Sequence, residues 1–367
     1  MDLTDPSDPM NELGFYVLAG APASPAPLMG EIELGEALGF GSAFISERYN
    51  IKEAATLSGA VGASSKRLGI ATAATNQNTR HPLITASMAT TMHRLTGGRF
   101  TLGLGRGVDA LFGAYGLAKI TTAQMEDFVG IMRRLWHGEA IFGHEGPAGR
   151  FPILHLDATF DEDIPIGLVA FGSNTLSLAG RAFDMVVLHT FFPDETVTRA
   201  VQTVRAAAEQ AGRDPAAVRI WSCYATIPDG LDHGLTLKKT VGRLATYLQG
   251  YGDLMVSTNG WDPAVLERFR ADEVVSAVPG AIDGVATTEQ LEHIATLLPP
   301  EWLEPAAIGS PEVCAKRVLR QFDLGVDGVI MHGATPAELA PVVAAYREIR
   351  PPGRFDHLAA NPGRAAV

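Results

Sequence analysis

Short apolar runs and amphipathic stretches alternate along most of the chain. Residues 13–20 and 67–75 are rich in strand-forming residues, whereas 27–40 carries Leu and Ile at helical spacing. A helix is expected over 82–98, because Pro82 opens it and a glycine pair follows its end. Such alternation predicts a parallel sheet covered by helices.

Eight strands can be counted, and most are followed by a helix. They are expected at 13–20, 41–48, 67–75, 99–105, 165–171, 183–191, 218–227 and 326–333. Eight βα units predict closure into an α/β fold of the (β/α)8 TIM barrel type, which forms one domain at this length. An open doubly wound sheet is the alternative, and it is disfavoured because no Rossmann fingerprint opens the chain.

Two segments interrupt the alternation and are expected as insertions after strand 4 and strand 7. Residues 139–164 hold two short apolar pieces around a Gly/Pro turn, which predicts a β-hairpin. Residues 229–305 are polar and helical, and too long for an ordinary loop. The remaining boundaries are a disordered lead at 1–11, a single barrel domain at 12–350 and an irregular tail at 351–367.

The composition excludes several classes of function. The 46% hydrophobic content supports a large core, and the net charge of −12 argues against nucleic acid as a partner. Cys223 and Cys314 are the two cysteines and lie far apart, so we expect no metal site and a reducing, cytoplasmic location. No apolar run is long enough for a membrane span.

Gly103, Gly105 and Gly107 alternate in "GRFTLGLGRG", at the end of the fourth expected strand. Their spacing differs from the dinucleotide fingerprint G-x-G-x-x-G. In a barrel they fall at the carboxyl end of a strand, where active sites lie and where glycine lets a backbone approach a flat ligand. Crowding in the barrel core also favours small residues, so both interpretations stay open.

Four segments in matching barrel positions resemble the luciferase-like superfamily of (β/α)8 flavin and deazaflavin oxidoreductases. They are "GFGSAFISER", "GIATAATNQNTRHPLITA", "GGRFTLGLGRG" and "VAFGSNTLSLAGRAFDMVVL". The chain looks most like the actinobacterial branch that uses coenzyme F420. The resemblance implies hydride transfer between the deazaflavin and a small organic substrate, in a homodimer that an F420 reductase supplies with reduced cofactor. The alternatives are an FMN-dependent monooxygenase with a flavin reductase partner, and a non-catalytic barrel that binds a flavin or a metabolite.

The resemblance also implies where the cofactor binds. The ring is expected over the ends of strands two to four, against a bulge at 71–75 that often contains a non-proline cis peptide. The phosphate is expected where a helix opens after "VAFG", and the residue types there independently favour either an anion site or an ordinary helix cap. The expected cofactor-binding residues are Arg48, Ala73, Ala74, Gly103, Gly105, Arg106, Gly107, Gly172, Ser173 and Asn174.

The chain departs from the family pattern where other members carry acid and base groups. Glu47 and Arg48 replace an Asp–His pair, and Val108 stands in place of a Glu, with Asp109 next. We predict catalytic roles for Glu47, Asp109 and His189, because strand ends in barrels carry chemistry and histidine titrates near neutral pH. A surface Glu–Arg pair and a structural histidine are the alternatives.

Arginines are expected in neighbouring loops of the barrel mouth. Arg48, Arg80 and Arg106 fall there in an otherwise acidic chain. By charge complementarity they predict an anionic ligand, with scattered surface arginines as the alternative.

Overall fold

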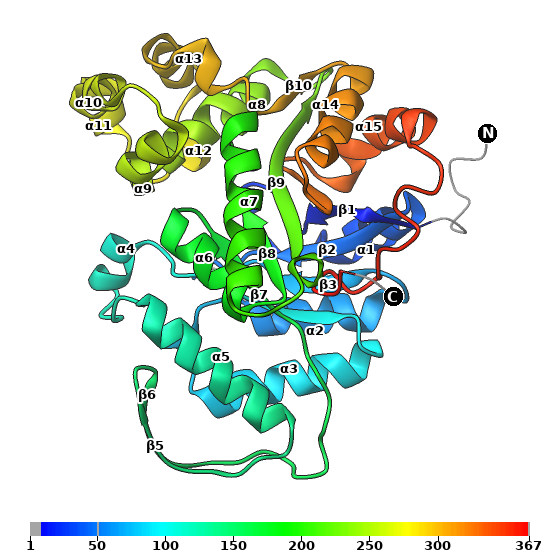
Figure 1. Ribbon diagram of the computed structural model, residues 1–367. Coiled ribbons are helices and arrows are strands. Elements are labelled where there is room, and N and C mark those ends of the chain that lie inside the picture. Colours follow the sequence, from blue (N-terminus) through cyan, green and yellow to red (C-terminus); the bar gives the residue numbers. More distant parts are fainter. Residues whose placement is uncertain (1–8, 50, 366–367) are drawn as a thin grey trace.

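The computed structural model describes residues 9–49 and 51–365, and its centre is a closed barrel of eight parallel strands (Figure 1). The barrel strands are β1 (Met10–Tyr16), β2 (Phe40–Ile45), β3 (Gly69–Thr72), β4 (Phe100–Leu104), β7 (Ile166–Ala170), β8 (Met185–Leu188), β9 (Arg219–Pro228) and β11 (Gly328–His332). β11 pairs with β1 through Leu13 and Val329, which closes the ring. The short strand β10 (Ala307–Gly309) adds to the carboxyl end of β9. The predicted (β/α)8 barrel is confirmed.

Helices cover the outside of the barrel. They are α1 (Leu28–Ala37), α2 (Ala54–Ser64), α3 (Pro82–Thr96), α4 (Asp109–Ala114), α5 (Thr122–Trp136), α6 (Ser173–Ala182), α7 (Asp194–Gln210), α14 (Pro311–Asp323) and α15 (Pro336–Ile349). Single turns of 3-10 helix lie at Gln77–Thr79, Pro215–Ala217 and Pro300–Trp302. The sequence of α5 explains why it forms a helix here. Thr121 and Gln124 form a capping box at its start, and Phe128 and Met132 are buried on the side that faces the barrel.

The first insertion is a two-stranded antiparallel hairpin. β5 (Ile141–Gly146) pairs with β6 (Gly149–Leu154), with Phe142 opposite Ile153. In Figure 1 the hairpin projects from the barrel near α5. The hairpin therefore exposes side chains that the barrel does not cover.

The second insertion is helical and has its own hydrophobic core. Its helices are α8 (His233–Leu237), a π-helix at Lys238–Gly242, α9 (Arg243–Asn259), α10 (Pro263–Ala271), α11 (Glu273–Ala277), α12 (Ile282–Val285) and α13 (Thr288–Leu297). Leu248, Phe269 and Trp302 belong to that core. α9 is kinked at Tyr251, between two glycines, where the backbone leaves the helical region. The kink and the π-helix shape the part of the insertion that faces the barrel.

The tail is irregular in backbone, as predicted, yet it is buried under the amino-terminal floor of the barrel. Arg219, the first residue of β9, is fully buried. Its Nη1 donates to the carbonyls of Ala359, Asn361 and Arg364 at 2.8, 2.9 and 3.2 Å. Burial lowers the pKa of Arg219 to about 10, so the guanidinium stays charged at neutral pH and is neutralised by these dipoles.

Asn361 attaches the same tail to β4. Thr101 Oγ1 donates to Asn361 Oδ1 at 2.6 Å, and Asn361 Nδ2 donates to the carbonyls of Gly98 and Phe100 at 2.6 and 3.0 Å. These three groups of the barrel would lose the hydrogen bonds to Asn361 without the tail. The tail is thus an integral part of the barrel.

The first barrel strand begins earlier than predicted. β1 begins at Met10, whose side chain is fully buried, and Asn11 Nδ2 donates to the carbonyl of Leu358 at 2.8 Å. The predicted disordered lead at 1–11 is therefore wrong for Met10 and Asn11, because the tail supplies buried partners for them. Residues 1–8 lie outside the described residues.

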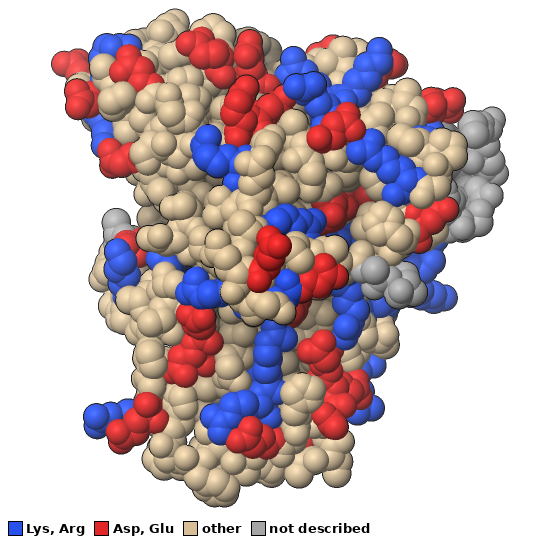
Figure 2. Space-filling view, in the orientation of Figure 1, with Lys and Arg blue, Asp and Glu red and all other residues tan. Residues whose placement is uncertain are grey.

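The molecular surface is mixed in charge. Figure 2 shows acidic and basic side chains interspersed over the face drawn. Among the described residues, no helix has both the length and the apolar character needed to cross a bilayer. The same residues contain no group of three His, Cys, Asp or Glu placed to hold a metal ion, and both cysteines are free and buried.

Candidate active site at the barrel mouth

Glu47 lies just after β2 and its carboxylate is almost fully buried. Its side chain is 4% exposed, and the carboxylate accepts hydrogen bonds from Arg80 Nη1 at 3.2 Å and from Thr75 Oγ1. Arg80 also pairs with Glu53. Arg48, the sequence neighbour, instead donates from Nη1 to the backbone carbonyl of Glu47 at 3.2 Å. The alternative of a surface Glu47–Arg48 pair is therefore not found, and Glu47 pairs with Arg80 instead.

A bulge follows β3 at the position predicted from the resemblance. The Ala73–Ala74 peptide bond is cis. The Ala74 carbonyl accepts from the Glu47 N–H at 3.1 Å, and Thr75 N–H donates to the Gly103 carbonyl at 3.0 Å. The bulge is thus tied to β4 on one side and to the loop after β2 on the other.

The alternating glycines let β4 pack against this bulge. A Cβ at Gly103 would lie 1.7 Å from the Thr72 carbonyl oxygen, and one at Gly105 would lie 2.8 Å from Ala74 Cβ. Gly107 has a φ of +71°, and a Cβ there would meet the Phe112 ring at 2.2 Å. The glycines therefore have a packing role, and the wall formed by Ala73, Ala74 and Gly105 carries only small side chains. We call these three residues the small-residue wall.

Arg106 and Asp109 lie in the segment after β4. The half-buried Arg106 guanidinium donates to Thr122 Oγ1, and burial lowers its pKa while nearby Asp109 opposes that shift. Asp109 is half exposed and its carboxylate pairs with Lys119 Nζ at 2.6 Å. In the described part of the chain we find no contact between Asp109 and either Glu47 or His189. The three predicted catalytic residues therefore occupy three separate places.

The start of α6 opens into a cavity. Gly172 is its N-cap and no side chain caps the helix, while Ser173 and Asn174 are exposed. The cavity, about 430 Å³ in volume, is lined by Gly172 and Ser173 and by Arg199 of α7. Uncapped backbone N–H groups at a helix start are a common feature of anion sites. Arg199 Nη2 donates to Thr196 Oγ1 at 3.1 Å and to the Thr258 carbonyl at 2.6 Å.

His189 follows β8 and is enclosed by aromatic rings. Its ring centroid lies 4.3 Å from that of Phe171 and 4.6 and 5.3 Å from those of Tyr247 and Tyr251. Burial lowers the pKa of His189 to about 4, so the imidazole is neutral at pH 7. Nδ1 lies 3.1 Å from the Thr190 carbonyl, which only accepts, so Nδ1 carries the proton and Nε2 is an acceptor.

The mouth also contains residues that the sequence did not single out. Tyr247 and Tyr251 reach it from α9, and Arg243 opens the same helix. Thr190 Oγ1 lies 3.2 Å from Cys223 Sγ, and Tyr16 ends β1. A long polar insertion indicates a lid over a barrel, but its helical pattern does not show which side chains point into the mouth.

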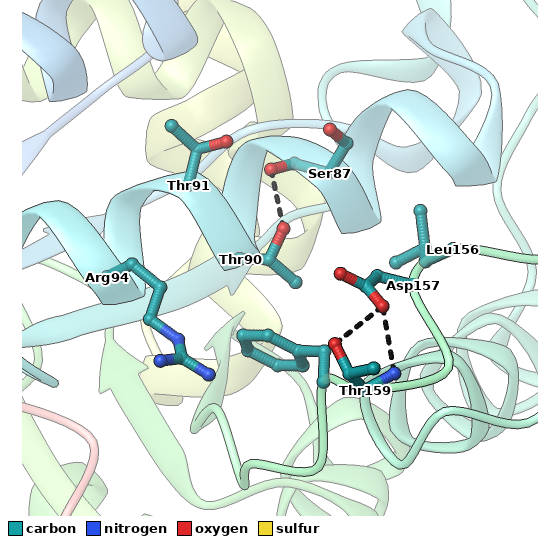
Figure 3. A pocket seen from close by; sticks show the side chains of 8 residues that line it. Ser87, Thr90, Thr91, Arg94, Leu156, Asp157 and Thr159 are labelled. Atoms are coloured by element: carbon teal, nitrogen blue, oxygen red, sulfur yellow. Dashed lines mark hydrogen bonds between the residues drawn. The ribbon is translucent and has the colours of Figure 1, made fainter.

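A larger cavity of about 670 Å³ lies on the outside of the barrel, between α3 and the segment after β6 (Figure 3). Its polar groups bind one another. Asp157 Oδ1 accepts from the N–H and Oγ1 of Thr159 at 2.8 and 2.7 Å, and Thr90 Oγ1 donates to the Ser87 carbonyl at 2.9 Å. With its hydrogen bonds satisfied locally, this cavity is a weaker candidate for chemistry than the mouth.

The closed barrel and the side chains gathered at its strand ends define a (β/α)8 barrel enzyme. The sequence model of the family described as luciferase-like monooxygenase matches residues 14–328. The chain belongs to this family and is an oxidoreductase-type enzyme, which sets aside the non-catalytic barrel.

Three known proteins illustrate the similarity. A 5,10-methylenetetrahydromethanopterin reductase from Methanolobus tindarius is 26% identical over 335 residues, covering 89% of this chain and 91% of the relative. The structure of the coenzyme F420 dependent tetrahydromethanopterin reductase from Methanopyrus kandleri matches with a TM-score of 0.75 at 19% identity, covering 92% and 99%. An F420-dependent secondary alcohol dehydrogenase with an F420-acetone adduct matches with a TM-score of 0.69 at 16% identity, covering 93% and 99%. The two structures share the barrel fold with this chain.

Proposed function

We propose that the protein is a coenzyme F420-dependent oxidoreductase that transfers a hydride between the deazaflavin and a small organic substrate. The observation that carries the proposal is the uncapped start of α6, which opens into the cavity beside Arg199. The similarity to the reductase from Methanolobus tindarius and to two F420-dependent enzymes supports it.

The residues at the mouth fit such a cofactor. Gly172, Ser173 and Asn174 would bind its phosphate through backbone N–H groups, with Arg199 adding positive charge. The small-residue wall has no side chain large enough to keep a flat ring away from β3 and β4. When bound, the deazaflavin supplies a two-electron hydride carrier, and the protein contributes binding, orientation and electrostatics.

The predicted catalytic residues take different roles in this proposal. His189 is neutral at pH 7, so it accepts a hydrogen bond through Nε2 and orients the ligand that donates it. Glu47 is a positioning residue, because Arg80 and Thr75 occupy its carboxylate and its N–H holds the bulge. The exposed Asp109–Lys119 pair gives Asp109 no contact with the proposed cofactor site.

Parallel fluorescence titrations of the purified protein with F420 and FMN test the proposal. We expect tighter binding of F420, followed by F420-dependent turnover when candidate substrates are added. An FMN-dependent monooxygenase is the second candidate, favoured by the description of the family. Tighter binding of FMN would replace the first proposal with the second.

We further propose a homodimer that receives reduced cofactor from an F420 reductase, or from a flavin reductase if FMN is bound. Ile84, Phe142 and Ile153 are 59%, 73% and 54% exposed, and His81 and Phe151 bring α3 and the hairpin together. Such apolar exposure favours contact with a second copy. Light scattering of the wild type and of Phe142→Ser tests this, with a monomeric wild type as the contrary result. The two free thiols support a cytoplasmic location as a prediction.

A further inference from the structure

Three cationic side chains gather on one side of the barrel mouth, beneath the start of α9. Arg48 and Lys52 come from the loop after β2, and Arg243 is the first residue of α9. Burial lowers the pKa of Lys52 to about 8, and the charges of Arg48 and Arg243 act in the same direction. Arg48 and Arg243 therefore both lie within electrostatic reach of Lys52, whose Nζ donates to the carbonyls of Leu18 and Gly20. We call the three residues the cationic cluster.

His332, at the end of β11, lies beside this cluster. Its ring meets the Tyr16 ring edge-on, with centroids 5.4 Å apart. Burial and then the charges of the cationic cluster hold the pKa of His332 well below its ordinary value. The ring is neutral at pH 7 and adds hydrogen-bonding atoms to the cluster without adding charge.

Nearby carboxylates offset part of the charge of the cationic cluster. Asp283 Oδ2 pairs with Arg243 Nη1 at 2.7 Å. Glu31 accepts a hydrogen bond from the Leu18 N–H at 2.7 Å and its charge offsets that of Lys52, while burial raises the pKa of Glu31. Arg48 forms no ion pair with a carboxylate of residues 9–49 or 51–365. Arg48 therefore brings to the mouth a positive charge that no described carboxylate pairs with, although the whole chain is acidic.

Two nitrogen atoms on this side of the mouth are buried. Neither Arg243 Nε nor His332 Nδ1 makes a hydrogen bond to any described residue. Such atoms are rare in folded proteins because they cost free energy, and a bound ligand is one way to satisfy them. The Nε–H of Arg243 can only donate, so together with the charge of Arg48 it indicates a negatively charged acceptor, to which His332 Nδ1 can also donate when it carries the ring proton.

The cationic cluster lies across the mouth from the proposed phosphate site. In the ring, β1 is separated from β7 by β2, β3 and β4 in one direction and by β8, β9 and β11 in the other. The cofactor is proposed to occupy β3, β4 and the start of α6 after β7. The side formed by β11, β1 and β2 is therefore left for the substrate.

We propose that the substrate carries a carboxylate or phosphate group that binds between Arg48 and Arg243, beside His332. This rests on the proposed function, which places the cofactor on the other side of the mouth. Guanidinium groups bind such anions with two parallel hydrogen bonds. Tyr247 and Tyr251 supply aromatic surface next to Arg243, whose guanidinium lies 5.9 Å from the Tyr247 ring centroid. The substrate class is thus a small organic anion with an apolar body.

A matched pair of probes tests the proposal without knowledge of the natural substrate. Benzoate and its neutral isostere benzamide are titrated calorimetrically into the wild type, first alone and then saturated with F420. Arg48→Met and Arg243→Met are compared with Arg270→Met, which removes an exposed ion pair with Asp253 in the same insertion. A melting curve of each variant checks that it is folded. Arg48→Met is the variant expected to keep its stability, because Arg48 is exposed and pairs with no carboxylate of the described chain.

We expect the F420-saturated wild type to bind benzoate roughly tenfold or more tightly than benzamide. That preference should disappear in Arg48→Met and in a folded Arg243→Met, and persist in Arg270→Met. Equal binding of the two probes, no binding of benzoate, or an unchanged preference in Arg48→Met would overturn the proposal. Displacement of benzoate by F420 would assign the cationic cluster to the cofactor instead. The affinity for F420 itself reports separately on the proposed function.

Discussion

Glu47 Oε1 lies 2.5 Å from Arg80 Nη2, and the two residues connect the loops that follow β2 and β3. Both side chains are largely buried, at 4% and 15% exposure. Since the N–H of Glu47 also holds the Ala74 carbonyl, the pair sets the position of the bulge against β4.

Glu47→Gln is therefore expected to lower the free energy of unfolding, with a smaller direct effect on turnover. The amide keeps the shape but cannot satisfy two donors as the carboxylate does, which costs about 1–3 kcal/mol of unfolding free energy. Urea unfolding measures the loss, with Glu126→Gln in the exposed pair with Arg181 as a control that should change little. Wild-type stability combined with loss of turnover would instead support a direct catalytic role for Glu47.

Gly105→Ala is expected to weaken both stability and cofactor binding. The new methyl group would lie 2.8 Å from Ala74 Cβ and push the bulge, at a cost of about 1–3 kcal/mol. Gly130→Ala in α5 is a matched control, since a Cβ there meets nothing within 4 Å and should stabilise the helix by up to about 1 kcal/mol. Calorimetric melting and F420 titration distinguish the two variants. A fully stable Gly105→Ala would show that the bulge can move freely.

Ser173→Asp is expected to abolish tight cofactor binding while the fold stays intact. A carboxylate at the first position of α6 repels a phosphate there, yet it interacts favourably with the helix dipole, by about 0.3–1 kcal/mol. Ser173→Ala, which adds no charge, is the control and should bind nearly as well as the wild type. Retained affinity in Ser173→Asp would place the phosphate elsewhere.

The lowered pKa of His189 predicts that the protein loses stability at acidic pH. Its folded pKa of about 4 lies below the ordinary value of 6.5, so the unfolded chain takes up a proton first as the pH falls. The stabilisation from the neutral His189 is fully present above about pH 6.5. As the pH falls to about 4, the free energy of unfolding decreases by roughly 3 kcal/mol. In His189→Asn, whose amide can still donate to the Thr190 carbonyl, stability should fall less between these pH values. Identical pH profiles for both proteins would contradict the buried, neutral histidine.

Asn361→Ala is expected to destabilise the barrel strongly, although the residue lies far from the mouth. It would leave Thr101 Oγ1 and the carbonyls of Gly98 and Phe100 without their partner, at a total cost of about 3 kcal/mol or more. Arg364→Met, whose side chain is 44% exposed, should have a smaller effect. Equal melting temperatures for the two variants would show that the tail is dispensable.

Periodicity in the sequence predicted the eight strands and both insertions, because each element buries a face that its own residues define. It did not predict contacts between loops. The partner of Glu47 is Arg80, 33 positions away, and only the closed barrel brings the two together. The packing role of Gly103 and Gly105 likewise depends on the bulge after β3.

The proposed substrate side of the mouth was beyond sequence reasoning for a similar reason. Arg243, Tyr247 and Tyr251 come from a helical insertion whose kink and π-helix depart from regular periodicity. The tail gave little sign of burial, because Pro, Gly and Asn in "AANPGR" resemble those of any exposed loop. Its buried state follows from the unpaired groups on the barrel floor that it satisfies.

The floor of the barrel joins parts of the chain that are synthesised at opposite times. Asn11 in β1 donates a hydrogen bond to Leu358, which is 347 positions later in the sequence. Arg219 donates to the carbonyls of Ala359 and Asn361, which are synthesised long after it. Contacts of such long separation slow folding, because the loop entropy must be lost before they form. A nascent chain that already contains all eight strands therefore still carries a charged, unsheltered Arg219. The amino-terminal floor of the barrel is therefore completed only when the segment around Ala359 and Asn361 docks.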